Sequence, residues 1–238
     1  MAHILIKWIG GSLAALVVLL GIAWIGNEIS NSRSFQLVGQ LVTRAERTDS
    51  VVALTFDDGP TPQHTDSVLA ILSEFGAPAT FFMVGRSMER DPEVVARVRQ
   101  QGHEIGNHSY SHRRLILKAP SIIRQEVQRT DSLIRAAGQD KEAFMRPPYG
   151  KRLVGLPLYL SREGRPILLW DVEPDTYYNR AGGMVEYVLE HTRPGSIILL
   201  HVEIPARRES RLALRRIIPA LQSRGYRFVT LSELMEGP

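Results

Sequence analysis

Two adjacent carboxylates, Asp57 and Asp58, follow a short apolar run, Val51–Leu54. The run has the length and the β-branched residues of a buried strand. Neighbouring carboxylates raise each other's pKa, and removal from water costs further free energy. A metal ion or a paired cation would remove that cost. A solvated Asp-Gly-Pro turn through Gly59 and Pro60 is the alternative, because a motif match alone is only a hypothesis.

A second group of candidate ligands comes from histidine. His108 and His112 are four residues apart, a spacing that lets both imidazoles face one point on a helical turn. Two histidines and one aspartate form the open three-ligand set of a catalytic zinc site. The other aspartate would then be free to act as a general base on an activated water. We expect one divalent cation, Zn²⁺ first, with Co²⁺, Mn²⁺ and Ni²⁺ as alternatives.

An arginine and a third histidine complete the set. Arg146 precedes two prolines that keep its segment extended and rigid, and its permanent charge can hold a carboxylate in one orientation. His201 ends an apolar run and has the titration range to protonate a leaving amine. A neighbouring acid would orient His201 and keep it protonated. Glu173 is the first choice for this acid, with Asp171 and Asp175 as alternatives.

Short apolar runs alternate with amphipathic segments from residue 51 onward. We expect strands near 51–54, 79–84, 103–107, 166–172, 196–200 and 226–230, and helices near 62–75, 92–101, 121–137, 181–192 and 212–223. This alternation predicts an α/β fold with a parallel sheet and outer helices, either a barrel or an open sheet. In such barrels the chemistry gathers at the carboxyl ends of strands. Five of the expected strand ends carry an aspartate, a histidine, an arginine, an acid and a histidine, which predicts one shared site.

The composition narrows the class of protein. The chain has 238 residues, 44% of them hydrophobic, which suits one domain with a tail. It has no cysteine, so disulfides and thiolate chemistry are excluded. The net charge of +4 is too small to indicate a nucleic-acid partner.

The N-terminus is apolar. Ile9–Ile25 carries no charge and is near the minimum length of a membrane-spanning helix, with Trp8 and Trp24 at its ends. We expect residues 1–26 to be a single-pass anchor, 27–49 a tether and 50–238 a domain on the outer side of the membrane. A cleaved signal peptide, which would leave a secreted protein, and a buried core helix are the alternatives.

The combined motifs resemble the polysaccharide deacetylase (NodB-like) domain of carbohydrate esterase family 4. The resemblance covers residues from about 50 to 235. The motifs follow in the family's order: Thr-Phe-Asp-Asp-Gly-Pro at 55–60, His-Ser-x-x-His at 108–112, Arg-Pro-Pro-Tyr at 146–149, Trp-Asp-Val-Glu from 170 and Leu-Leu-His at 199–201.

The resemblance implies a deformed (β/α) barrel of about seven strands. It implies hydrolysis of N-acetyl groups on an amino-sugar glycan of the cell envelope or exterior, with release of acetate. It implies that Asp57 is the base, that Arg146 tunes Asp57, and that the metal ligands are Asp58, His108 and His112. It implies that His201 is the acid and that Glu173 orients it. The backbone N–H of Tyr149 would donate to the oxyanion, and Pro148 and Tyr177 would lie at the substrate.

Three positions depart from the family pattern. Glu173 and Tyr177 stand where the family usually has aspartate and tryptophan, and Val202 stands where aspartate is common. The same site would also cleave an O-acetyl ester, a formamide on a lipid-linked sugar or a small cyclic amide. A silent glycan-binding module is the alternative outside enzymes.

Overall fold

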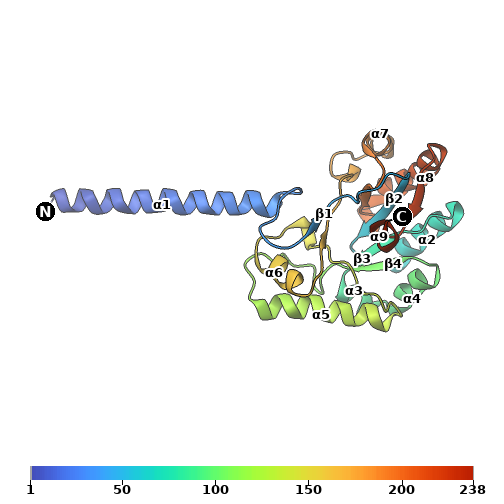
Figure 1. Cartoon of the computed structure of the whole chain (residues 1–238), viewed down its shortest axis with the longest axis horizontal. Helices are drawn as coiled ribbons and strands as arrows, with labels where there is room; N and C mark the ends of the chain where they lie inside the picture. The colour runs from blue at the N-terminus through green and yellow to red at the C-terminus, as the bar shows by residue number, and fades with distance from the viewer. Residues whose placement is uncertain (1, 238) are drawn as a thin grey trace.

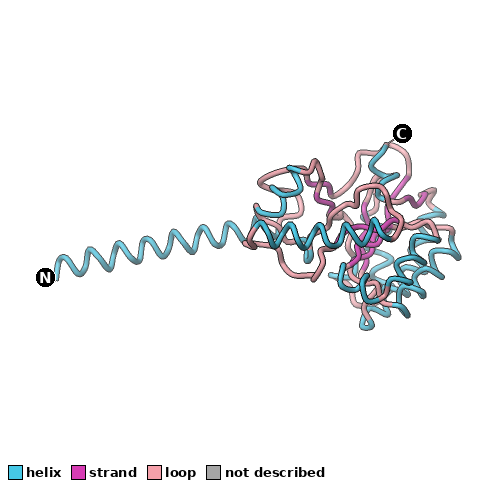
Figure 2. The backbone as a smooth tube through the Cα atoms, turned by 90° about the horizontal axis from the view of Figure 1, so that it is seen from below, coloured by secondary structure: helices cyan, strands magenta, loops and turns pink. Residues whose placement is uncertain are grey.

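The computed structural model describes residues 2–237, with the side chains of the first helix described from Ala15 onward. Helix α1 (Ala2–Asn31) projects from a mixed α/β body (Figure 1). Within that body the strands lie inside and the other helices lie outside them (Figure 2). This arrangement buries the apolar strands on both faces, as parallel sheets require.

All strand pairs are parallel. The strands are β1 (Leu41–Val42), β2 (Val51–Asp57), β3 (Thr80–Met83), β4 (Glu104–Asn107), β5 (Ile167–Leu168), β6 (Ile197–Leu200) and β7 (Arg227–Val229). One sheet has the order β4-β3-β2-β6 with β7 on β2, and β1 pairs with β5 in a second sheet. All seven residues of β2 are buried, so the central strand has the continuous apolar character that the sequence predicts.

The two sheets are joined by single bridges. Met145 bridges Asn107 of β4 on one side and Ile167 of β5 on the other, and Val172 bridges Ile198 of β6. The predicted α/β class with parallel strands is therefore confirmed. The expected barrel of about seven strands is seen as two sheets linked by these bridges, because the chain from 143 to 172 forms only one short strand.

The helices follow the strands on the outside. They are α2 (Pro62–Phe75), α3 (Gly85–Arg90), α4 (Pro92–Gln100), α5 (Pro120–Ala136), α6 (Gly155–Arg162), α7 (Ala181–His191), α8 (Arg208–Ser223) and α9 (Leu231–Glu236). Their apolar faces pack on the sheets, for example through Leu72 of α2 and Ile218 of α8. Burial of one such side chain stabilises the fold by about 1.5–3 kcal/mol. Helix α8 begins four residues before the predicted start at 212, because a polar first turn shows no apolar periodicity.

Residues 27–49, predicted as a tether, contribute regular structure and pair with the body. Helix α1 continues to Asn31, β1 pairs with β5, and Arg44 bridges Ser196. The sequence does not mark β1, because a two-residue strand is too short to leave a periodic pattern.

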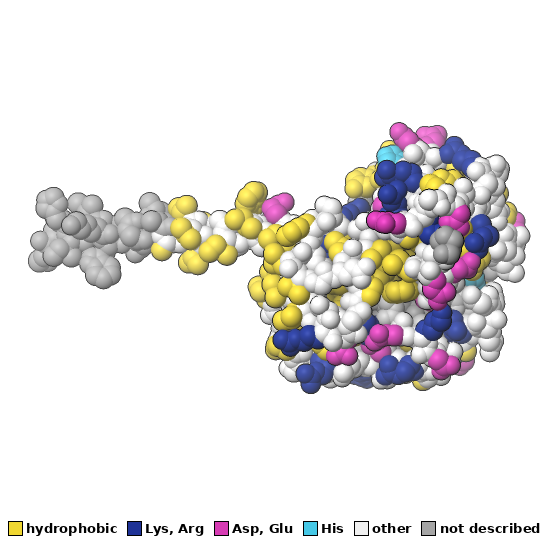
Figure 3. Space-filling view, in the orientation of Figure 1, with side chains coloured by type: hydrophobic (Ala, Val, Ile, Leu, Met, Phe, Trp, Pro, Cys, Tyr) yellow, Lys and Arg dark blue, Asp and Glu magenta, His cyan; other side chains and the backbone are white. Residues whose placement is uncertain are grey.

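No helix within the described residues is both long and apolar enough to cross a membrane. The predicted anchor, residues 1–26 with its apolar run Ile9–Ile25, falls partly on residues 1–14, whose side chains lie outside the described part of the chain. In the described part of α1, the side chains of residues 16–20 are apolar and exposed (Figure 3).

Candidate active site

The carboxyl ends of the parallel strands open into one cavity of about 550 Å³. Seven of the predicted site residues line it: Asp57, Asp58, His108, His112, Tyr149, Glu173 and His201. Arg146 lies buried beneath it, Pro148 is buried, and Tyr177 lies outside the lining. The structure thus brings together most of the side chains that the motifs predict.

Asp57, the last residue of β2, is paired with Arg146. Arg146 Nη1 lies 2.7 Å from Asp57 Oδ1, and both side chains are almost completely buried. The guanidinium also donates to Thr55 Oγ1 and to the carbonyl oxygens of Leu168 and Leu169, so each of its nitrogens has an acceptor. Burial alone would raise the pKa of Asp57, but the charges of Arg146, His108 and His201 and the hydrogen bond from Arg146 together outweigh it and hold that pKa below its ordinary value. Asp57 is therefore ionised and held in one orientation at neutral pH.

Asp58, His108 and His112 form a candidate metal centre. One donor atom from each lies within 4.8 Å of the others. His108 Nδ1 lies 2.8 Å from the carbonyl oxygen of Arg146, so this nitrogen donates and Nε2 keeps its lone pair. Burial, followed by the charge of His108, lowers the pKa of His112, which favours the neutral ring that a metal needs. One carboxylate and two imidazoles with open positions fit a divalent cation such as Zn²⁺.

The loop that carries the two histidines is not a helical turn. Residues 108–112 have no helical assignment, and Ser109 and His112 have φ of 61° and 57°. The helical-turn prediction was wrong in local structure. The imidazoles nevertheless face each other, with ring centroids 5.0 Å apart. The left-handed turns, and not a 3.6-residue repeat, bring them together.

Three residues of the cavity have left-handed backbones. Asp58, His112 and Tyr149 have φ of 75°, 57° and 62°. Such a conformation costs roughly 1 kcal/mol or more for a residue with a side chain. Its recurrence at one cavity indicates that the surrounding fold holds these residues in place.

Asp175, and not Glu173, orients His201. Asp175 Oδ1 lies 3.2 Å from His201 Nδ1, and its Oδ2 accepts from the His201 backbone N–H at 2.7 Å. Asp171 instead accepts from Ser196 Oγ and the Ile197 backbone N–H. Burial alone would lower the pKa of His201, but the hydrogen bond and charge of Asp175 raise it to about 9. His201 therefore carries a proton at neutral pH.

Glu173 has a different set of partners. It accepts from Trp170 Nε1 at 3.0 Å and from Thr176 Oγ1 at 2.8 Å, and it is paired with Arg33. Asn31, Arg33 and Arg207 also line the cavity. None of these three was a predicted site residue: no motif marks Asn31 or Arg33, and Arg207 is marked only by the four-residue repeat that it shares with Arg211 and Arg215.

Tyr149 offers a backbone donor to the cavity. It sits in the single turn Pro148–Gly150, and no acceptor in the described part of the chain takes its N–H. Its side chain is 57% exposed, and its ring lies 4.8 Å from that of His112. Tyr177, predicted at the sugar cleft, is exposed, and its ring centroid lies 5.6 Å from that of Tyr187.

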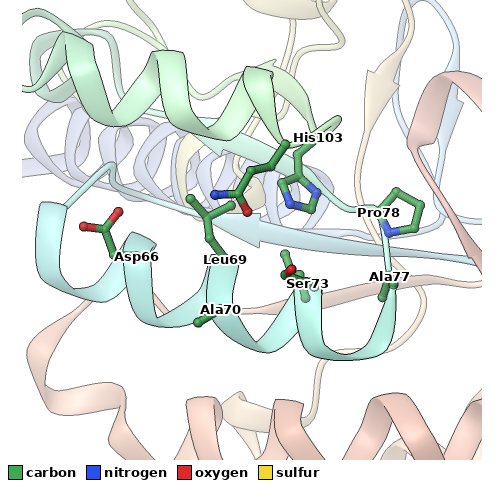
Figure 4. A pocket seen from close by; sticks show the side chains of 10 residues that line it. Asp66, Leu69, Ala70, Ser73, Ala77, Pro78 and His103 are labelled. Carbon is green, nitrogen blue, oxygen red and sulfur yellow. The ribbon is translucent and has the colours of Figure 1, made fainter.

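A second hollow of about 680 Å³ lies at the opposite end of the strands (Figure 4). Pro78 and His103, which precede β3 and β4, line it together with residues of α2. Burial lowers the pKa of His103 to about 4, and its Nδ1 accepts from the Ala79 backbone N–H. Asp66 and Ser73 of α2 also line this hollow, and Asp66 is paired with Arg97.

The chain is similar to known polysaccharide deacetylases. Residues 44–162 match the sequence profile of the polysaccharide deacetylase family. The chain is 34% identical over 187 residues to a peptidoglycan-N-acetylglucosamine deacetylase of Bacillus cereus (strain ATCC 14579), covering 78% of this chain and 68% of that protein. It is 35% identical over 188 residues to the peptidoglycan-N-acetylmuramic acid deacetylase PdaC of Bacillus subtilis (strain 168), covering 78% and 39%.

The fold is similar to that of a solved relative. The crystal structure of the Bc1960 peptidoglycan N-acetylglucosamine deacetylase aligns with a TM-score of 0.76 at 32% sequence identity. The alignment covers 82% of this chain and 92% of that one. The similarity therefore extends over most of this chain and nearly all of that one.

Proposed function

The chain belongs to the polysaccharide deacetylase family, and we propose that it removes N-acetyl groups from an amino-sugar glycan of the cell envelope or exterior in a metal-dependent hydrolysis. One observation carries the proposal. A buried Asp57–Arg146 pair, the triad Asp58, His108 and His112, and a protonated His201 meet at one cavity. These are the base, the ligand set and the acid that amide hydrolysis needs.

Asp58, His108 and His112 would hold the cation. A divalent metal ion bound there would supply Lewis-acid activation of water and of the acetyl carbonyl. Zn²⁺ is the ion that this donor set favours, with Co²⁺, Mn²⁺ and Ni²⁺ as alternatives.

Asp57 acts as the general base in this proposal. It takes a proton from the attacking water as the water oxygen bonds to the acetyl carbon, and Arg146 keeps the carboxylate ionised and aimed. The Tyr149 N–H donates to the oxygen that becomes negative in the transition state. His201 gives its proton to the sugar nitrogen as the C–N bond breaks, so that acetate and a free amine leave.

Acetate release tests the function. The full chain with zinc should release acetate from N-acetylated peptidoglycan or chitin oligomers, and mass spectrometry should show the loss of acetyl groups. A panel with O-acetyl esters, N-formyl sugars and small cyclic amides measures the alternative substrates. Turnover of one of these without acetate from any N-acetylated glycan would disprove the substrate class.

The silent-module alternative is weaker. A glycan-binding module needs neither a buried base nor a protonated acid, yet Asp57 and His201 are both placed at the cavity. Glycan binding without turnover by the zinc-loaded chain would restore that alternative.

The dependence of activity on pH should reflect the pKa of His201. Because the acid must be protonated, activity should fall as pH rises through about 9, the raised pKa of His201. Asp175→Asn removes the charge that raises this pKa while burial still lowers it, so the alkaline limb of kcat/KM should move toward or below the ordinary value of 6.5. The matched control is Asp171→Asn, since Asp171 is also near the strand end but bonds Ser196. Equal shifts in both variants would exclude the specific pairing.

We also propose that residues 1–26 anchor the enzyme. The support is the apolar run Ile9–Ile25 and the exposed apolar side chains of residues 16–20. Carbonate-washed membranes from expressing cells should retain the full-length chain. Recovery of a shortened chain from the medium would show secretion instead.

A further inference from the structure

One wall of the cavity comes from residues that precede the family match. Asn31 and Arg33 line the cavity, whereas the match to the family profile begins at residue 44. Neither Asn31 nor Arg33 was among the predicted site residues. The segment that carries it joins the end of α1 to β1.

Buried Arg152 ties this wall to the loop that carries Tyr149. Its backbone N–H donates to the Ser30 carbonyl, and its guanidinium donates to the Phe35 carbonyl and to Gln36 Oε1. Arg152 is only 2% exposed. A guanidinium with this many acceptors holds its partners in one arrangement. The segment around Arg33 is therefore held beside the turn Pro148–Gly150, which carries Tyr149.

Arg33 has donors left for a ligand. Its guanidinium carbon lies 5.0 Å from the centroid of the Trp170 ring, and Nη2 donates to Glu173. Within the described residues, Nε and Nη1 have no acceptor, and the side chain is 42% exposed. Glu173 already has Trp170 and Thr176 as donors, so Arg33 is not its only partner.

We propose that Arg33 is a specificity-determining residue that binds a carboxylate carried by the N-acetylated sugar itself. The inference rests on the proposed deacetylase function and names its substrate class as an acidic amino sugar. A planar guanidinium whose position is set by an aromatic face is pre-organised for a carboxylate. Arg207 lines the same cavity and adds a second positive charge. Its Nη1 donates a hydrogen bond to the backbone carbonyl oxygen of Asp175.

The test compares three probes that differ in charge. N-acetylmuramic acid carries a carboxylate, its methyl ester keeps the bulk without the charge, and N-acetylglucosamine has neither. We expect the zinc-loaded full-length chain to bind the acid more tightly than the ester by NMR titration. Arg33→Gln should reduce this preference about tenfold, as expected for a partly exposed charge-assisted hydrogen bond. In turnover of the matching oligomers, the loss should appear in KM and only for the acidic glycan.

Two further variants sharpen the test. Arg33→Lys keeps the positive charge but lacks the planar guanidinium that can donate two parallel hydrogen bonds. It should therefore retain part of the preference for the acid over the ester. Arg90→Gln removes an exposed arginine that pairs with Asp91 outside the cavity, and it should leave the preference unchanged. Equal binding of acid and ester by the unmodified chain, or an equal loss for all three probes in Arg33→Gln, would overturn the proposal. If no oligomer is hydrolysed, the proposed deacetylase function is wrong. The binding preference for the acid over the ester still tests the proposed role of Arg33.

Discussion

Asp58→Ala should release the metal and lower the rate of deacetylation by about 1000-fold or more, because metal activation supplies several kcal/mol of charge stabilisation. Asp58 is the only carboxylate of the candidate centre formed with His108 and His112. His112→Gln should lose metal in the same way, since its Nε2 lies 3.2 Å from Asp58 Oδ1. A chelator should remove the metal from the unmodified chain and lower its rate of deacetylation in the same way. Added zinc should restore the chelated, unmodified chain but neither variant.

Metal content by elemental mass spectrometry and acetate release measure this prediction together. Asp66→Ala is the matched control, because Asp66 is an exposed acid of α2 that pairs with Arg97. Asp58 has φ of 75°, so its replacement by alanine should also reduce stability by about 1 kcal/mol, which a thermal melt will separate from the catalytic loss. A folded Asp58→Ala chain with full metal content and full activity would disprove the ligand assignment.

Asp57→Asn should reduce kcat by about 100- to 10,000-fold, the usual contribution of a general base, while the metal stays bound. The amide has nearly the shape of the carboxylate but cannot take the proton from water. Asp57 is not among the three candidate ligands, so metal content should stay at the level of the unmodified chain. The separation of metal binding from turnover distinguishes this variant from Asp58→Ala.

The same change should also lower stability. It leaves the buried charge of Arg146 without its anionic partner, and breaking such a pair costs about 3–5 kcal/mol. Asp131→Asn is the control, because Asp131 and Arg165 form another buried pair, with 2.7 Å between Oδ2 and Nη1. It should lose stability but keep its kcat per folded molecule. A similar kcat for folded Asp57→Asn and unmodified enzyme would reject the base assignment.

The sequence alone determined the fold class and most of the side chains that line the cavity. Asp57, Asp58, His108, Arg146 and His201 each end or follow an expected strand or short apolar run, and parallel strands place such positions at one edge. The periodicity of buried runs and amphipathic segments is a local property, so the order of strands and helices could be predicted. Short elements such as β1, which carries only two residues, left no such pattern.

Only the tertiary structure decided which neighbours those residues have. Asp171, Glu173 and Asp175 alternate within five positions, and the single turn Pro174–Thr176 selects Asp175 for His201. Arg33 reaches the cavity from 140 residues before its partner Glu173. Contacts between distant segments depend on how the whole chain packs, and neither residue type nor spacing records them.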